Sequence, residues 1–136
     1  MGKIFLVRKE HFSASHRLHS YTLSDEENKR IFDKCNNPNG HGHNYTLEVT
    51  LYADVDPDTG MIINLVDLKG IIKTYILDPF DHKHLNLDTE EFKALNPTVE
   101  NMVVVFWDIL KKTDISDYLY EVRLYETENN VAYYRG

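Results

Sequence analysis

The sequence has a single cysteine, more acidic than basic residues, and no apolar run of the roughly 20 residues that a membrane-spanning helix needs. One cysteine, Cys35, cannot form a disulfide within the chain, which excludes a small secreted scaffold held by disulfides. Residues 1–8 lack the apolar stretch and cleavage site of a signal peptide, so we expect a cytoplasmic protein without a membrane partner. The balance of 15 basic against 22 acidic residues, a net charge of −7, argues against a nucleic-acid-binding protein.

The length of 136 residues suits one domain, and we expect residues 1–136 to form a single unit. Hydrophobic residues make up 42% of the chain and charged residues 27%, a balance typical of a globular rather than a disordered protein. The chain shows no linker, low-complexity segment or internal repeat.

Periodicity predicts strands near both ends and helices between them. Apolar residues spaced three and four apart predict helices over 68–76 and 102–110, and Ser24 with Glu27 forms the sequence signature of a capping box before a short helix that ends near residue 34. Asp78 and Pro79 are expected to stop the first long helix. Strands are expected in the segments 4–16, 41–51, 118–126 and 131–134, and the segment 61–64 after a turn can return as a further short strand.

This order of elements predicts an α+β fold in which two helices pack on one face of a four-stranded antiparallel sheet. Alternation along 41–51 places His41, His43, Tyr45 and the apolar residues that follow on one face of a strand. Alternation along 118–126 likewise places Tyr118, Tyr120, Val122, Leu124 and Glu126 on one face. The opposite face of the sheet would need another subunit to cover it.

The candidate chemistry is concentrated at His41 and His43. In a strand, residues i and i+2 project to the same side, so both imidazoles can bind one metal ion. A pair of histidines at this spacing is also common on protein surfaces, but here the pair ends an apolar stripe, where a polar side chain needs a partner. Three neutral histidines suit Zn²⁺ and leave a fourth position open for substrate. The residues alone leave five candidates for the third ligand, namely His11, His16, His19, His82 and His84.

Several further side chains have both a functional and an ordinary interpretation. Cys35 is a fourth metal ligand, a nearby thiolate of lowered pKa, or simply a buried apolar residue. Asp81 next to His82 sets the tautomer of that imidazole, or the two form a solvated loop pair. Glu126 ends an apolar stripe, either at a frayed strand end or as a buried acceptor for the N–H groups of a ligand. Glu100 is explained most simply by its place near a helix N-terminus.

Five segments together resemble the 6-pyruvoyltetrahydropterin synthase family. They are residues 12–18 (FSASHRL), 35–45 (CNNPNGHGHNY), 81–85 (DHKHL), 98–101 (TVEN) and 125–127 (YET). Their order and number make the resemblance specific, and it spans nearly the whole chain. The resemblance implies the tunnelling fold, in which trimers close their sheets into a barrel and two trimers stack as a hexamer with active sites between subunits.

The resemblance also implies the activity and the residue roles. The family converts 7,8-dihydroneopterin triphosphate into 6-pyruvoyltetrahydropterin and releases triphosphate, on the route to tetrahydrobiopterin. His16, His41 and His43 match its zinc ligands, and Cys35 matches the residue that abstracts a proton, assisted by a pair that matches Asp81 and His82. Glu126 matches the carboxylate that anchors the pterin, and the segment from Thr98 to Glu100 matches part of the pterin pocket. Magnesium would act through the triphosphate.

Two alternatives remain. A 6-carboxytetrahydropterin synthase takes the same substrate but typically has three residues between the cysteine and the HGH motif, where this chain has five. A noncatalytic pterin- or zinc-binding module would keep the histidines without needing Cys35, Asp81 and His82. A triphosphate needs basic groups, for which Arg17, Lys34 and Lys83 are candidates.

Overall fold

The structure is a computed structural model and describes residues 2–136. Its centre is a long antiparallel hairpin of β1 (Ile4–His16) and β2 (His41–Ala53), paired along their whole length from Ile4 opposite Ala53 to His16 opposite His41. Next to β2 lies β4 (Leu119–Tyr125), and β5 (Val131–Tyr134) pairs with β4. All of these pairs are antiparallel, as the alternation predicts.

The sheet has five strands rather than the four predicted, and it is mixed. The fifth strand is β3 (Lys83–His84), which pairs in parallel with Ala14 and Ser15 of β1 and gives the order β3-β1-β2-β4-β5. Two residues are too few to show any periodicity, which is why sequence patterning misses this strand. The predicted strand 61–64 does not form. Its last residue, Asn64, instead begins a helix, because its side-chain oxygen accepts a hydrogen bond from the backbone N–H of Val66 at 2.9 Å.

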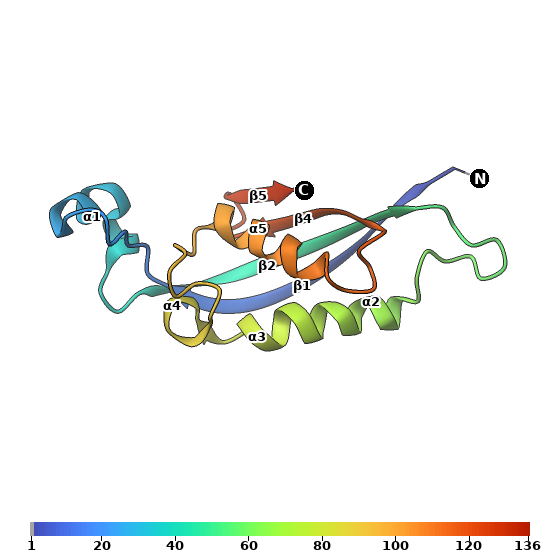
Figure 1. Ribbon diagram of the computed structural model, residues 1–136, viewed down its shortest axis with the longest axis horizontal. Coiled ribbons are helices and arrows are strands. Elements are labelled where there is room, and N and C mark those ends of the chain that lie inside the picture. The colour runs from blue at the N-terminus through green and yellow to red at the C-terminus, as the bar shows by residue number, and fades with distance from the viewer. Residues whose placement is uncertain (1) are drawn as a thin grey trace.

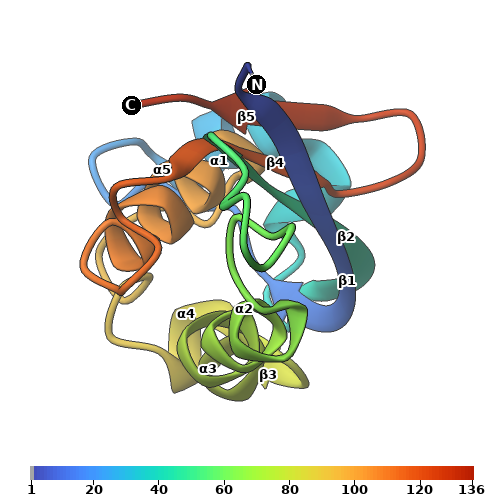
Figure 2. The same ribbon diagram turned by 90° about the vertical axis from the view of Figure 1, so that its right-hand side faces the viewer.

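Two long helical segments cover one face of the sheet (Figures 1 and 2). The first begins as α2 (Leu65–Ile72), continues through a π-helical turn, η2 (Lys73–Leu77), and ends as α3 (Asp78–Phe80). The prediction that Asp78 and Pro79 stop this helix is therefore wrong. Pro79 lies one residue before the end of this segment, directly after the π-helical turn, in which the backbone N–H of Asp78 donates to the carbonyl of Lys73, five residues earlier. The second long helix is α5 (Val99–Leu110).

The core lies between these helices and the sheet. Leu47, Val49 and Leu51 of β2 are fully buried, and so are Ile72 and Phe106 of the helices. Burying a side chain of this size contributes roughly 1.5–3 kcal/mol, so this layer fixes the position of the hairpin. The predicted stripe on β4 is only partly right. A register shift opposite Thr50 and Leu51 places Leu119, Val122 and Leu124 in the core, whereas Tyr120 contacts Phe5 of β1 at 4.9 Å between ring centroids.

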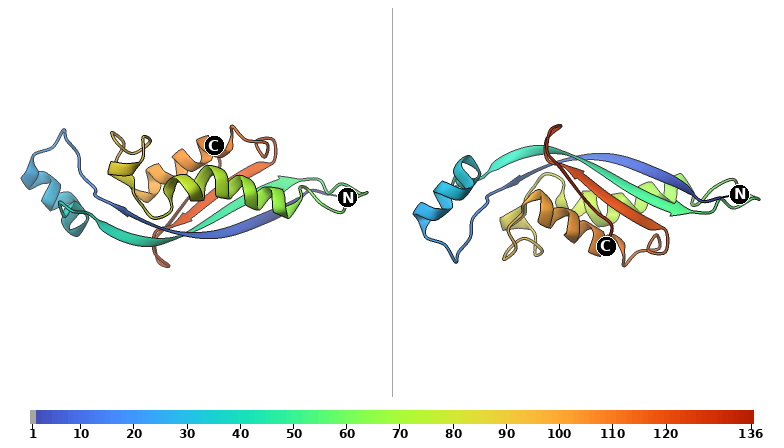
Figure 3. Two further views of the ribbon diagram at one scale, coloured as in Figure 1. Left: turned by 90° about the horizontal axis from the view of Figure 1, so that it is seen from below. Right: turned by 90° about the horizontal axis from the view of Figure 1, so that it is seen from above.

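The chain between β1 and β2 projects from one end of the molecule (Figures 1 and 3). It contains α1 (Asp25–Phe32) and a 3₁₀ turn, η1 (Asp33–Asn36). The predicted capping box is confirmed, since Ser24 and Glu27 exchange side-chain to backbone hydrogen bonds. A short helix, α4 (Leu85–Asp88), follows β3. Within residues 2–136, no helix combines the length and apolar character needed to cross a membrane.

Candidate metal centre and active site

Three histidines meet at the end of the β1–β2 hairpin. The register pairs His16 with His41 and Ala14 with His43, and the alternation of both strands turns all three imidazoles toward the helical side. Their rings lie 4.8–5.0 Å apart between centroids, and one nitrogen from each lies within 4.8 Å of the others. Among the five candidates for the third ligand, the fold therefore selects His16.

The arrangement fits a tetrahedral metal ion. The Nε2 atoms of His41 and His43 are 3.0 Å apart, close to the spacing of about 3.3 Å that two zinc–nitrogen bonds at a tetrahedral angle require. His16 donates from Nδ1 to the carbonyl oxygen of Pro97 at 2.8 Å, because a carbonyl only accepts. Its Nε2 is then a lone-pair donor, and it is buried with no hydrogen-bond partner among the described residues. A buried orphan nitrogen facing two other imidazoles is the arrangement that a metal ion satisfies.

Burial favours the neutral form of two of these rings, the form in which a histidine binds a metal ion. Burial, followed by the nearby His43, lowers the pKa of His16 from 6.5 to about 4. Burial also lowers the pKa of His43, although the carboxylate of Glu126 opposes this effect. The Oε1 atom of Glu126 lies 3.9 Å from Nε2 of His43.

Cys35 lies near this centre but outside the metal-binding group. The donor atoms gathered within 4.8 Å of one another in the described chain belong to the three histidines and do not include the Cys35 sulfur. Burial raises the pKa of the Cys35 thiol, and the carboxylates of Glu126 and Asp33 raise it further. Within one chain the thiol is therefore less acidic than usual, opposite to the lowered pKa that a thiolate needs.

A cavity of about 580 Å³ opens beside Glu126. Its wall includes Thr98, Glu100 and Glu126, together with apolar side chains such as Leu18 and Val99. Thr98 also begins α5, where its hydroxyl oxygen accepts from the N–H of Asn101 at 3.2 Å, and Glu100 lies in the first turn of that helix. Both interpretations of Glu100 thus apply, since it faces the cavity from a helix N-terminus. The cavity offers carboxylates for N–H donors and an apolar surface for a flat ring.

Asp81 and His82 form a close pair at the opposite edge of the sheet. Nδ1 of His82 lies 2.8 Å from Oδ1 of Asp81, and the same carboxylate oxygen accepts a hydrogen bond from the backbone N–H of Ser13 at 2.9 Å. His82 has a φ of +60°, a strained value for a residue other than glycine, and its side chain is 82% exposed. The Ser13 contact holds the Asp81 carboxylate next to the imidazole of His82. No contact among the described residues joins it to Cys35.

Three other histidines lie outside this centre. His11 contacts the hydroxyl of Thr46 at 3.1 Å on the uncovered face of the sheet, and His19 contacts the side chain of Asn36 at 2.8 Å. His84 lies close to Gly40, where an added Cβ would approach its Nε2 to 2.9 Å. None of the three belongs to the group of metal-binding nitrogens in the described chain.

Known proteins resemble this chain over nearly its whole length. A family model described as 6-pyruvoyl tetrahydropterin synthase matches residues 5–136. The human 6-pyruvoyl tetrahydrobiopterin synthase is 51% identical over 129 residues, which cover 95% of this chain and 89% of the human protein. The chain belongs to the 6-pyruvoyl tetrahydropterin synthase family.

Two further relatives support the assignment. The 6-pyruvoyl tetrahydrobiopterin synthase of Dictyostelium discoideum is 48% identical, over 98% of this chain and 96% of that protein. The structure of the Caenorhabditis elegans 6-pyruvoyl tetrahydropterin synthase superposes with a TM-score of 0.96 at 44% identity, covering 100% of this chain and 97% of the other. The resemblance read from the five segments is thereby confirmed, as is the prediction of an enzyme of this family, a lyase.

In this member of the 6-pyruvoyl tetrahydropterin synthase family, a single chain brings most of the predicted site residues together without a residue from a second subunit. The three histidines, Glu126 and Cys35 lie around one centre, and Thr98 and Glu100 line the adjoining cavity. Asp81 and His82 stand apart at the β3 edge.

The sequence indicates no role at the metal centre for two residues that contact His16. The carbonyl of Pro97 orients His16, and no local pattern connects residues 81 positions apart. Tyr45 is fully buried, its hydroxyl lies 3.4 Å from Nδ1 of His16, and burial followed by Glu126 raises its pKa. The alternation of β2 predicts that Tyr45 shares a face with His43, but it does not show that the Tyr45 hydroxyl reaches His16.

Proposed function

We propose that this enzyme is zinc-dependent and converts 7,8-dihydroneopterin triphosphate into 6-pyruvoyl-5,6,7,8-tetrahydropterin with elimination of triphosphate. The observation that carries the proposal is the buried, unpartnered Nε2 of His16 facing His41 and His43, beside a cavity that contains Glu126. His16, His41 and His43 hold the metal, and Mg²⁺ acts through the triphosphate of the substrate.

Glu126 and Glu100 bind the pterin. An aminopyrimidinone edge presents adjacent N–H groups, and a carboxylate can accept two of them at once. The side chain of Glu126 is 18% exposed, so these charged hydrogen bonds form largely out of water. Thr98 and the neighbouring apolar wall support the ring. Because Glu126 also lies 3.9 Å from His43, a pterin bound to it places its side chain next to the metal site.

The reaction is an internal redox change. The ring gains two hydrogens that one hydroxyl-bearing carbon of the side chain loses, and loss of triphosphate converts the rest of that side chain into a methyl ketone. No external oxidant or reductant is needed. Bound zinc would polarise the side-chain hydroxyl oxygens and make the neighbouring C–H groups more acidic. Cys35 takes a carbon-bound proton from one position and delivers it to another.

Assembly of several subunits would bring a base to Cys35 and so complete the proton relay. Cys35 has a raised pKa within one chain and needs a base to become a thiolate. The paired Asp81 and His82 lie at the β3 edge, whereas Glu126 follows β4 near the opposite edge. Closure of three sheets edge to edge into a barrel brings these edges together between neighbouring subunits. We therefore include the trimer, its stacking into a hexamer, and a cytoplasmic location in the proposal.

Two alternatives fit the residues less well. The five residues between Cys35 and the HGH motif favour a pyruvoyl synthase over a 6-carboxytetrahydropterin synthase. A noncatalytic pterin- or zinc-binding module has no use for a thiol beside the metal site, or for an imidazole paired with the carboxylate of Asp81.

The test is to incubate the purified enzyme with 7,8-dihydroneopterin triphosphate, zinc and magnesium and to identify the product by mass. We expect a tetrahydropterin that keeps all three side-chain carbons, with triphosphate released in equal amount. Release of acetaldehyde would instead establish the carboxy synthase reaction. Tight binding of the substrate without turnover would establish a binding module.

A further inference from the structure

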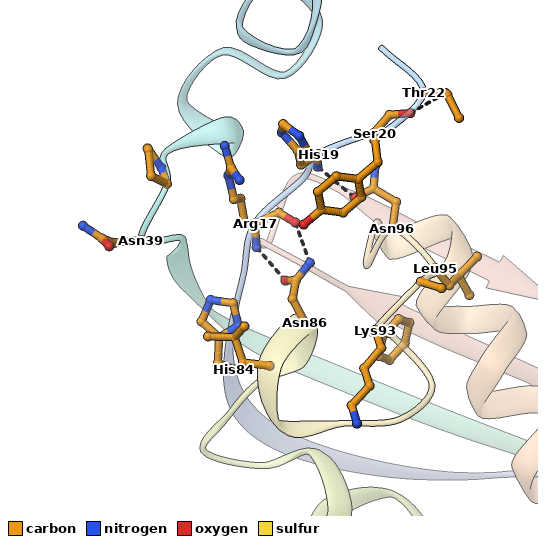
Figure 4. A pocket seen from close by; sticks show the side chains of 15 residues that line it. Arg17, His19, Ser20, Thr22, Asn39, His84, Asn86, Lys93, Leu95 and Asn96 are labelled. Atoms are coloured by element: carbon orange, nitrogen blue, oxygen red, sulfur yellow. Dashed lines mark hydrogen bonds between the residues drawn. The ribbon is translucent and has the colours of Figure 1, made fainter. Parts of the chain in front are cut away.

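The segment that follows the metal ligand His16 is fixed to the body of the protein by two asparagines. The side chain of Asn86 accepts from the backbone N–H of Arg17 at 2.8 Å and donates to its carbonyl at 2.9 Å, so that one amide satisfies both backbone groups (Figure 4). Asn96 accepts from the backbone N–H of His19 at 3.2 Å. Residues 17–19 therefore form a rigid extension of β1 whose position is coupled to His16.

The segment that carries Cys35 is bound to this extension through its neighbour Asn36. Asn36 is 4% exposed, while the residues that follow it, Asn37, Pro38 and Asn39, are all exposed. Its side-chain amide donates to the carbonyl of Leu18 at 2.8 Å and contacts Nδ1 of His19, also at 2.8 Å. The backbone N–H of Leu18 donates in turn to the carbonyl of Cys35 at 2.8 Å.

The donors and acceptors of this contact match one to one. A primary amide has two N–H donors, and the carbonyl of Leu18 can only accept, so Nδ2 of Asn36 faces it. The second N–H of the same nitrogen then points to Nδ1 of His19, which must be unprotonated to accept it. Both amide hydrogens of Asn36 are thereby used, on two consecutive residues of the extension.

We infer that Asn36 is a positioning residue that holds the Cys35 thiol in place beside the metal centre. This inference rests on the proposed role of Cys35 as the proton-transferring group. The path is short, because His16 leads directly into residues 17–19, and Asn36 connects those residues to Cys35. Without the Asn36 amide, the Leu18 to Cys35 backbone bond and a longer bond of 3.2 Å from Arg17 Nε to the Asn36 carbonyl remain. Because η1 is a single turn, these two bonds leave the thiol free to shift.

The first experiment compares Asn36→Ala with Asn39→Ala, an exposed asparagine of the same loop that makes no hydrogen bond among the described contacts. We expect Asn36→Ala to lower kcat by about 10- to 100-fold, because small misplacements of a reacting group cost that much, while KM changes by less than about 3-fold. Zinc content per chain should stay at the wild-type value in both variants. A purely structural role would instead reduce zinc content and the yield of folded enzyme, with kcat per zinc-loaded site unchanged.

The second readout is alkylation of Cys35 by iodoacetamide at a fixed pH, which is unambiguous because the chain has one cysteine. Asn36→Ala should react at least about 3-fold faster than Asn39→Ala, because a loosened thiol loses the burial that protects it. This readout needs no substrate. If the wild-type enzyme did not turn over the pterin, the proposed function would be wrong. The alkylation rates would still test whether Asn36 positions the Cys35 thiol.

A second pair of variants tests the same hydrogen bond from the side of His19, in case Asn36→Ala does not fold. In His19→Leu the acceptor for the second amide hydrogen is lost, whereas in His19→Asn an oxygen occupies nearly the position of Nδ1. We expect His19→Leu to shift kcat and alkylation in the same direction as Asn36→Ala, and His19→Asn to restore both toward wild type. Wild-type values of kcat and alkylation in both Asn36→Ala and His19→Leu would overturn the inference.

Discussion

Nδ1 of His16 donates to the carbonyl oxygen of Pro97 at 2.8 Å, across 81 residues of sequence. The contact fixes the tautomer of the imidazole, so that Nε2 points at His41 and His43 as a lone-pair donor. Pro97 directly precedes Thr98, which begins α5 and lines the cavity beside Glu126. One loop thus orients the imidazole of His16 and lines the cavity beside Glu126.

Replacement of His41 by alanine should release zinc. Loss of a second-shell partner alone costs 10- to 100-fold in metal affinity, so loss of a ligand should weaken zinc binding by at least about 100-fold. The matched control is His11→Ala, an exposed histidine on the other face of the hairpin. Metal analysis after dialysis checks both variants. Unchanged zinc content in His41→Ala would defeat the ligand assignment.

The stability of the metal-free enzyme should fall as the pH drops from 6.5 toward 4. His16 has a lowered native pKa of about 4, so over this range the unfolded chain binds a proton that the native chain does not. The native state thereby loses about 2 kcal/mol by pH 5 and about 3 kcal/mol by pH 4. Urea unfolding at pH 7.5 and pH 5 measures the change. In the variant His16→Asn, which has no titrating group at this position, the free energy of unfolding should change less with pH. An equal change in both proteins would contradict the lowered pKa of His16.

Cys35→Ala should separate catalysis from metal binding. Since the sulfur lies outside the group of metal-binding atoms, the variant should keep its zinc. Turnover should fall by roughly 10²- to 10⁴-fold, the usual contribution of a general acid or base. Zinc content and single-turnover rates give the two measurements. Loss of zinc together with activity would favour a site in which the cysteine is a structural ligand.

Glu126→Gln should weaken pterin binding and increase the reactivity of Cys35. Loss of charged hydrogen bonds to the ring should cost about 1.5–3 kcal/mol, or roughly 10- to 100-fold in affinity. The same carboxylate, after burial, raises the pKa of Cys35, so its removal should speed alkylation at pH 8. Glu128→Gln, at an exposed position two residues away, serves as control. Pterin affinity equal to that of wild type, measured by fluorescence titration, would count against the assignment.

Gly40→Ala should disturb the metal centre as well as the turn. Gly40 has a φ of +76°, and an added Cβ would lie 2.8 Å from the carbonyl oxygen of His16. Gly60 has a similar φ of +73° but nothing within 4 Å, so Gly60→Ala isolates the backbone strain. We expect about 1 kcal/mol of destabilisation in Gly60→Ala and about 1–3 kcal/mol more in Gly40→Ala. Equal losses of stability in the two variants, measured by thermal unfolding, would show that the contact between the added Cβ and His16 does not destabilise the protein.

Much of the local structure follows from the sequence. The capping box of Ser24 and Glu27, the start of α5 at Thr98 and the alternation of β2 are all recognisable from spacing. The placement of His41 and His43 on one face depends only on the two-residue period of a strand, and it holds wherever that strand is built into a sheet.

Other features depend on contacts between distant segments. The two-residue strand β3, the register shift that turns Tyr120 away from the core, and the π-helical turn before Pro79 have no periodic signal. The place of Asp81 and His82, at the edge of the sheet away from Cys35, depends on where the chain returns after α3.

The sequence by itself therefore determined which residue types are available for the chemistry, the placement of His41 and His43 on one strand face, and the family through five ordered segments, one of which contains His16. Only the tertiary structure showed that His16 lies beside that pair, which backbone carbonyl orients it, and how Asn36 connects Cys35 to it. The physical reason is that alternation and capping act over a few residues, whereas these contacts join segments 17 to 81 residues apart and arise only when the core packs.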